Sequence, residues 1–166
     1  PHVGIVTSIE PDHLENYNGA FEQLVAGYEG FMDNVPPDGL LLLGVDDPIV
    51  AQKARERTGN VLGYGFGEDA DWRAEDVRFV NGGSVFLAYL GQEYFGEFLL
   101  TVPGKHNVAN ALAAIAVGHH FGLRAENMAQ HLRSFCGAQR RFQIVGESSD
   151  VMVVDDYAHH PTEIAA

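Results

Sequence analysis

The sequence is poor in cysteine and in basic side chains. The single cysteine, Cys136, excludes a framework of internal disulfide bonds, which favours a reducing compartment. No segment resembles a secretory signal peptide, and no run of about 20 apolar residues is present to cross a bilayer. We therefore expect a cytoplasmic protein with no membrane partner.

The shortage of basic residues also limits the partners that the protein can have. Ten Lys and Arg residues stand against 23 Asp and Glu residues, giving a formal net charge of −13. The ten basic residues form no long basic run, whereas phosphate backbones and anionic lipids attract such clusters. We expect neither nucleic acid nor an anionic membrane as a partner.

Apolar runs and amphipathic segments alternate in the first 66 residues. Runs rich in Val, Leu and Ile predict buried strands, and the segments between them place apolar residues at helical spacing. This alternation is typical of an α/β fold with a mainly parallel, doubly wound sheet and crossover helices. The predicted strands are 3–9, 40–45 and 60–66, and the predicted helices are 21–32 and 48–58, with a turn at 16–19.

The pattern changes at Trp72. Three strand-like runs follow, separated by short turns that contain glycine, which indicates antiparallel hairpins. We expect a small antiparallel sheet, inserted at about 72–102 into the parallel fold. Beyond it the sequence predicts a helix ending near 121, a second helix with Met128, Leu132 and Phe135 on its apolar face, and strands through Val145 and at 151–154.

The first candidate site is Asp12-His13, at the end of the first predicted strand. A carboxylate and an imidazole at a strand's carboxyl end can bind Mg²⁺, directly or through water, or act as acid and base. The alternative is a capping Asp beside a surface His.

The second candidate lies where a predicted helix begins, at 104–110. Asn107 and Asn110 are three residues apart, so their amides lie on one helix face and can hydrogen-bond both donor and acceptor edges of a purine. The alternative is ordinary helix capping by Asn107.

Two further candidates lie in the last 27 residues. Arg140 and Arg141 precede a strand, where one guanidinium could bind phosphate bidentately while the other stays solvated or pairs with an acid. The string from Asp155 to Glu163 follows an apolar strand and brings together two Asp, one Tyr and two His within six residues. Carboxylates at such a strand end are well placed to accept ribose hydroxyls.

A complete ATP site is nevertheless not encoded. The sequence has no G-x-x-x-x-G-K-[ST] phosphate loop. The stretch from Pro103 to His106 contains a Gly-Lys pair, but it lacks the glycine five residues earlier and the Ser or Thr after the lysine.

Taken in order, these motifs resemble those of the Mur ligase family across essentially the whole chain. The nine residues from Asp155 to Glu163 are similar to the branch that attaches L-alanine to UDP-N-acetylmuramate. Many relatives carry a carbamylated lysine after the Asp-His pair, but residues 14–52 contain no lysine, which fits the alanine-adding and tripeptide-adding branches. The matching stretches are Asp12-His13, Gly104-Lys105-His106-Asn107 with Asn110, Arg140-Arg141-Phe142 and Asp155-Asp156-Tyr157-Ala158-His159-His160-Pro161-Thr162-Glu163.

The resemblance implies a ligase of three domains. Residues 1–146 would be most of the central, ATP-binding domain, and residues 147–166 would be the first strand and helix start of a Rossmann-like C-terminal domain. We expect the chain to be a fragment that is inactive alone, because the phosphate loop with its lysine and a metal-binding Glu are missing. A sheet without its neighbouring strands would expose edges, which favours association between copies.

The resemblance also implies a reaction and a set of roles. Family members use ATP and Mg²⁺ to convert a carboxylate into an acyl phosphate, which an amine then turns into an amide. Here that would be a step of peptidoglycan synthesis, on which cell wall, cell shape and cell division depend. The implied roles are Mg²⁺ binding by His13, adenine binding by His106, Asn107 and Asn110, γ-phosphate binding by Arg141, ribose binding by Asp156, and contact with phosphates or the amine by His159 and His160.

Three alternatives stay open. A murein-tripeptide recycling ligase of the same family differs in substrate rather than in chemistry. A non-catalytic nucleotide-binding module would use the same residues without turnover. A metal-dependent hydrolase would use as its ligands Asp12, His13, Asp155, Asp156, His159 and His160.

Overall fold

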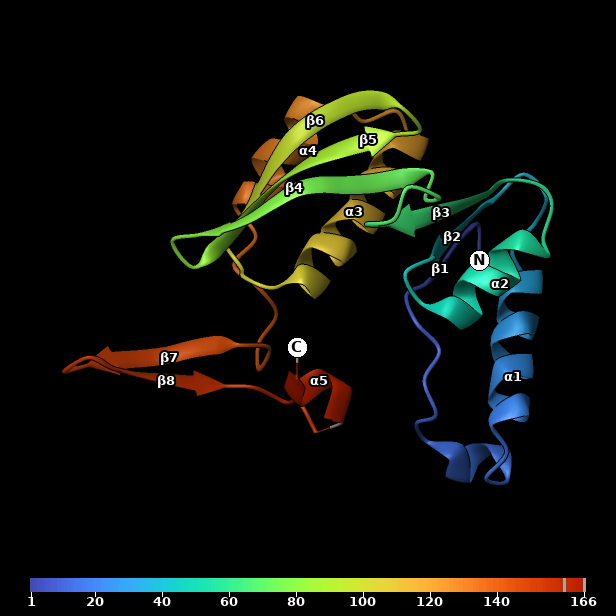
Figure 1. Ribbon diagram of the computed structural model, residues 1–166, viewed down its shortest axis with the longest axis horizontal. Coiled ribbons are helices and arrows are strands. Elements are labelled where there is room, and N and C mark those ends of the chain that lie inside the picture. The colour runs from blue at the N-terminus through green and yellow to red at the C-terminus, as the bar shows by residue number, and fades with distance from the viewer. Residues whose placement is uncertain (160, 166) are drawn as a thin grey trace.

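A six-stranded mixed sheet organises the protein, as the computed structural model in Figure 1 shows; it describes residues 1–159 and 161–165. The strands lie in the sheet in their order along the chain, β1 to β6. The first three pair in parallel and are joined by crossover helices, which confirms the α/β prediction. These elements are β1 (Val3–Val6), α1 (Phe21–Asp33), β2 (Leu40–Gly44), α2 (Pro48–Arg55) and β3 (Val61–Gly65).

Strand β2 is buried on both faces, so it separates two hydrophobic cores. Leu41 and Leu43 point into a core that they share with α1 and α2, whereas Leu40 and Leu42 point into a second core on the opposite face. Because successive side chains of a strand point to opposite faces, a run of four leucines suits a strand covered on both sides. The sheet is therefore doubly wound, as predicted.

The antiparallel strands are not a separate small sheet. β4 (Trp72–Val80) pairs in parallel with β3, and β5 (Gly83–Leu90) and β6 (Glu93–Leu100) follow it in the same sheet. The β3–β4 pairing covers only two residue pairs, Tyr64 with Trp72 and Gly65 with Arg73. Since β4 starts beside the end of β3, a short loop can join two parallel strands that would otherwise require a long crossover.

Helices α3 (Lys105–His120) and α4 (Ala125–Arg133) cover the second face of the sheet. Seven residues of α3 are buried, and Phe86 and Phe98 of the antiparallel strands stack with ring centroids 5.7 Å apart in the same core. At Gly118, any side chain would collide with Met128 of α4, so this glycine allows the two helices to pack closely.

The end of the chain forms a hairpin beside the main body. β7 (Gln143–Ser148) and β8 (Val151–Asp155) pair antiparallel, and helix α5 (Pro161–Ala165) follows; Figure 1 shows the hairpin lying apart from the large sheet. All six residues of β7 are exposed. Residue 146, after which the sequence predicts a domain boundary, lies inside β7.

Other departures from the predicted elements concern their ends. β1 stops at Val6 rather than at residue 9, α2 ends at Arg55 and α4 ends at Arg133, so Phe135 lies outside it. A 3₁₀ helix, η1 (Leu14–Tyr17), overlaps the first half of the predicted turn at 16–19. Among the described residues, no helix combines the length and the apolar character that crossing a bilayer would need.

Candidate functional site

The Asp12-His13 pair lies in a strained turn after β1. His13 has a φ of 53°, in the left-handed region that costs a residue other than glycine roughly 1 kcal/mol or more. Its backbone N–H donates to Asp12 Oδ1 at 2.8 Å, which holds the turn. The imidazole Nε2 lies 3.6 Å from Asp12 Oδ2, and Nδ1 lies 3.4 Å from Glu15 Oε1. The exposed ring is thus flanked by carboxylates and remains accessible to a ligand.

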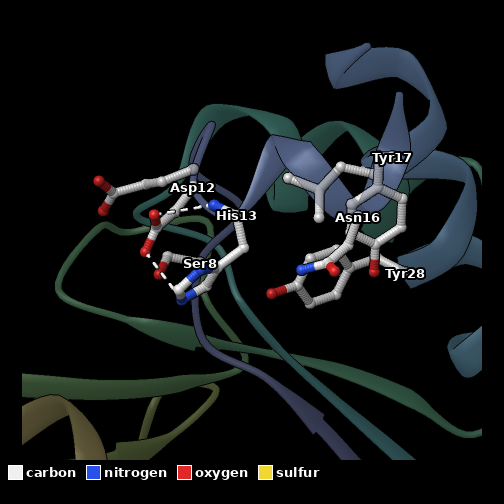
Figure 2. Close-up of a pocket in the computed structure, with 8 residues that line it drawn as sticks. Ser8, Asp12, His13, Asn16, Tyr17 and Tyr28 are labelled. Atoms are coloured by element: carbon white, nitrogen blue, oxygen red, sulfur yellow. Dashed lines mark hydrogen bonds and ion pairs between the residues drawn. The ribbon is translucent and has the colours of Figure 1, made fainter. Parts of the chain in front are cut away.

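This turn forms one wall of a pocket of about 470 Å³. Figure 2 shows Ser8, Asp12 and His13 on one side of the pocket, facing Tyr17 of η1 and Tyr28 of α1 on the other. Hydroxyl, carboxylate and imidazole groups combine here with aromatic surface, as in sites for small polar molecules. The pocket lies beyond the carboxyl end of β1, where α/β sheets bind their ligands.

The start of α3 supplies the second candidate group. The Asn107 side chain donates from Nδ2 to the carbonyl of Pro103 at 2.6 Å, which leaves Oδ1 to accept from a ligand N–H. His106 and Asn110 are exposed. Gly104 has a φ of 104°, and its ideal Cβ position would lie 2.6 Å from Cε1 of His106, so the imidazole lies against the glycine backbone.

The loop after β3 adds residues that the sequence analysis missed. Lys105 Nζ lies 4.2 Å from the ring centroid of Phe66, a cation–π distance, which links the start of α3 to the end of β3. Asp46, beyond β2, accepts from the Phe66 N–H at 3.0 and 3.2 Å. Burial, helped by the Asp46 charge, raises the pKa of Tyr64 to about 12, so Tyr64 stays a neutral phenol. No spacing rule joins these residues, because they meet only after the sheet has formed.

The two adjacent arginines differ in their contacts. Arg140 lies over the Tyr157 ring, with Cζ 4.7 Å from the centroid, and its Nε is 3.9 Å from Asp155 Oδ2. Arg141 instead donates from Nη1 to Glu163 Oε1 at 3.1 Å. Arg140 therefore packs against the segment that contains Asp155 and Tyr157, whereas Arg141 is half exposed and contacts α5.

The candidates from Asp155 onward are joined by backbone contacts. Asp156 accepts from the N–H of Phe142 at 2.9 Å and from the N–H of Ala158 at 2.8 Å. Each of its oxygens retains a second lone pair, so these bonds do not exclude a ribose hydroxyl. His159 contacts Glu163 through both its backbone N–H and its ring. His160, the other predicted imidazole, lies outside the described residues.

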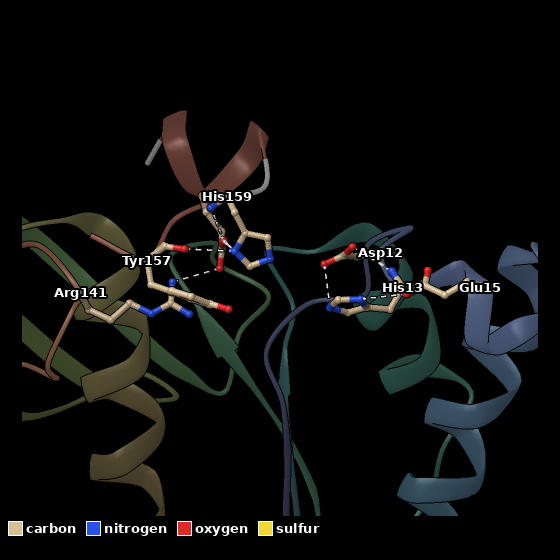
Figure 3. A network of polar contacts seen from close by, with 7 residues as sticks. Asp12, His13, Glu15, Arg141, Tyr157 and His159 are labelled. Carbon is tan, nitrogen blue, oxygen red and sulfur yellow. Dashed lines mark hydrogen bonds and ion pairs between the residues drawn. The ribbon is translucent and has the colours of Figure 1, made fainter. Parts of the chain in front are cut away.

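Figure 3 draws two of these groups in one view. Figure 3 shows Arg141, Tyr157 and His159 on one side, with Asp12, His13 and Glu15 facing them on the other. Within residues 1–159 and 161–165, no three His, Cys, Asp or Glu side chains gather closely enough to hold a metal ion. The arrangement offers no support for the multi-ligand metal site that the hydrolase alternative requires.

Comparison with known proteins identifies the family. Residues 1–118 match the Mur ligase middle domain, a span that includes Asp12, His13 and the start of α3. The chain belongs to the Mur ligase family. Arg141 and the residues from Asp155 to Glu163 lie beyond the matched span.

Individual relatives show to which Mur ligases this chain is similar in sequence. It is 40% identical to the UDP-N-acetylmuramate–L-alanine ligase of Symbiobacterium thermophilum, over 100% of this chain and 36% of the relative. The chain thus spans about a third of the length of the curated relatives it matches.

Solved structures agree on the fold. The UDP-N-acetylmuramate-alanine ligase of Thermotoga maritima superposes with a TM-score of 0.83 at 29% identity, covering 99% of this chain and 36% of that one. A MurF ligase from Thermotoga maritima, solved in complex with ADP, superposes with a TM-score of 0.81 at 22% identity, covering 99% of this chain and 38% of that one. The second likeness concerns the fold alone.

Proposed function

We propose that the chain is the middle part of an ATP-dependent ligase that joins L-alanine to UDP-N-acetylmuramate in peptidoglycan synthesis. The observation that carries the proposal is the 40% identity to an alanine ligase along the whole chain. The polar pocket that Asp12 and His13 line agrees with it, since amide formation needs nucleotide, carboxylate and amine held together.

The start of α3 suits the adenine of ATP. Asn107 Oδ1 can accept from the exocyclic amine, and Asn110 and His106 lie within one helical turn of it. Asp156 would accept a ribose hydroxyl through its second lone pairs. Arg141 would reach the γ-phosphate, because a guanidinium donates in a fork that matches phosphate oxygens.

His13 suits a Mg²⁺ ion that the phosphates of ATP would also bind. Magnesium keeps several waters and binds substrate phosphates with few protein ligands, so one accessible ligand from this chain is sufficient. The ion would reduce the repulsion between triphosphate and carboxylate, which otherwise opposes formation of the acyl phosphate. His159 and His160 would contact the phosphates or the incoming amine. Because the reaction consumes ATP, we also propose a cytoplasmic location.

The test uses the full-length protein that contains this chain. We expect Mg-ATP-dependent phosphate release with UDP-N-acetylmuramate and L-alanine, and none when Mg²⁺ is removed. Release with the murein tripeptide alone would instead identify a recycling ligase, and release with neither acceptor from a folded enzyme would refute a ligase. The 166-residue chain alone serves as a control that should release no phosphate, because it lacks a phosphate loop.

A further inference from the structure

Glu163 is a residue to which the proposed reaction has so far given no role. Its carboxylate lies in the first turn of α5 and is about one-third exposed. One oxygen, Oε1, accepts from Arg141 Nη1 at 3.1 Å. The other, Oε2, accepts from the His159 backbone N–H at 3.2 Å and lies 3.5 Å from the His159 ring Nδ1.

We propose that Glu163 is a positioning residue that orients Arg141 toward the γ-phosphate of ATP and fixes His159 beside it. The proposal rests on the proposed ligase function. Glu163 joins two segments, since Arg141 precedes β7 and His159 follows β8. Glu163 therefore contributes to the placement of two groups assigned to the reaction, and for the His159 ring it does so together with the Tyr157 carbonyl, which lies 3.1 Å from Nδ1.

The geometry indicates that Glu163 positions Arg141 for the nucleotide and does not compete with the nucleotide for it. The Arg141 contact uses one guanidinium nitrogen, and a guanidinium has five N–H donors, so an edge remains for a phosphate. The side chain of Arg141 is 53% exposed, which leaves that edge open to solvent. The carboxylate itself is held on its other oxygen by the backbone of residue 159, so it is fixed before ATP arrives.

The alternative is that Glu163 only caps α5. A Glu in the first helical turn commonly reaches back to a backbone N–H just before the helix, as Glu163 does to His159. A cap would affect stability but not the separate binding of ATP and acceptor. The test must therefore measure the binding of ATP and of L-alanine separately, as well as the stability of the fold.

The decisive variant is Glu163→Gln in the full-length protein. The contacts with Arg141 and His159 use different oxygens of Glu163, and a carboxamide replaces one of these oxygens with an NH₂ donor, so one of the two contacts is lost in this geometry. We expect the Kd and KM for Mg-ATP to rise about tenfold, the loss of one charge-assisted hydrogen bond, with the KM for L-alanine within about twofold of wild type. The matched control is Glu126→Gln, which removes an exposed carboxylate from the first turn of α4 and should leave both constants unchanged.

A double-mutant cycle separates the two mechanisms. In an Arg141→Ala background, Glu163→Gln should cause no further loss of ATP affinity, because its partner is already gone. Unchanged or tighter ATP binding by Glu163→Gln alone would overturn the positioning role. If the wild-type enzyme itself releases no phosphate with any acceptor, the ligase proposal fails first, and that result is distinguishable from a failure confined to the variant.

Discussion

At the scale of single residues, three left-handed backbone conformations lie in the segments that carry the candidate site. His13, Arg140 and Phe142 have φ values between 47° and 58°, where glycine is favoured. Two of these flank Arg141, and the third is the proposed metal ligand. A fold tolerates such strain where neighbouring contacts hold it, as the hydrogen bonds of Asp12 and Asp156 do here.

Gly104→Ala should weaken nucleotide binding by more than its cost in stability would explain. A side chain at φ 104° costs about 1–2 kcal/mol of unfolding free energy. Gly59→Ala is the matched control, since Gly59 has a φ of 105° with nothing within 4 Å of its Cβ position. Both variants should lose similar stability in thermal unfolding. Only Gly104→Ala should displace His106 and weaken ATP binding in a titration of the full-length protein.

Equal ATP affinities for the two glycine variants would contradict a role for His106 in holding adenine. The sequence identified Asn107 and Asn110 as candidates, because a helix start has recognisable local chemistry, whereas His106 was expected only from the family resemblance. The pairing of Lys105 with Phe66 and the bridge made by Glu163 were missed, since both depend on contacts between segments that local patterns do not link.

At the scale of elements, one carboxylate joins helix α2 to the segment that leads from β1 into the site. Asp47 caps α2 by accepting from the N–H groups of Ile49 and Val50, both at 2.9 Å. It also accepts from Ile9 N–H at 3.3 Å, three residues before Asp12. The sequence predicted the cap from Asp47-Pro48, but it could not predict the contact with Ile9.

Asp47→Ala should lower the unfolding free energy by about 1–2 kcal/mol, the usual cost of removing an N-cap. Urea titration of the 166-residue chain measures this loss. Asp47→Asn should retain most of the stability, because it keeps an acceptor oxygen. Asp38→Ala, which removes an exposed carboxylate from a turn, should change stability by less than about 0.5 kcal/mol. A loss at Asp47 no larger than at Asp38 would show that the cap contributes nothing.

Whether a segment forms a helix or a strand was easier to predict from the sequence than which strands pair with each other. β2 was recognisable because four consecutive leucines suit a strand buried on both faces. η1 was missed because it has no apolar periodicity and is bounded by His13 and Asn18, both in the left-handed region. The attachment of β4 to β3 escaped prediction because only two residue pairs form it.

At the scale of the whole molecule, the hairpin of β7 and β8 lacks the support that the large sheet has. Four of its apolar side chains are more than half exposed: Ile144, Val145, Val151 and Val153. A two-stranded hairpin without a covering layer is marginally stable in water. The sheet of β1 to β6, by contrast, has apolar cores on both faces.

Hydrogen exchange should therefore divide the 166-residue chain into two regions. Amides of β7 and β8 should exchange at least about 100-fold faster than those of β2 and β5, because local opening of the hairpin exposes no core. Strand β5 is the internal control, since it too is paired antiparallel but is covered by α3. Protection of the hairpin that increases with protein concentration would instead reveal association between copies. Protection equal to that of β5 at every concentration would contradict the expected division.

The unbroken strand order has a consequence for how the molecule is made. A ribosome releases β1 first and β6 last, and each strand pairs with the one synthesised just before it. No early strand has to wait for a partner beyond the next strand of the chain, so the sheet grows at the edge formed by its newest strand, opposite the outer edge of β1. Pairing between strands that are neighbours in sequence is fast, which shortens the time for which the growing edge is available to other nascent chains.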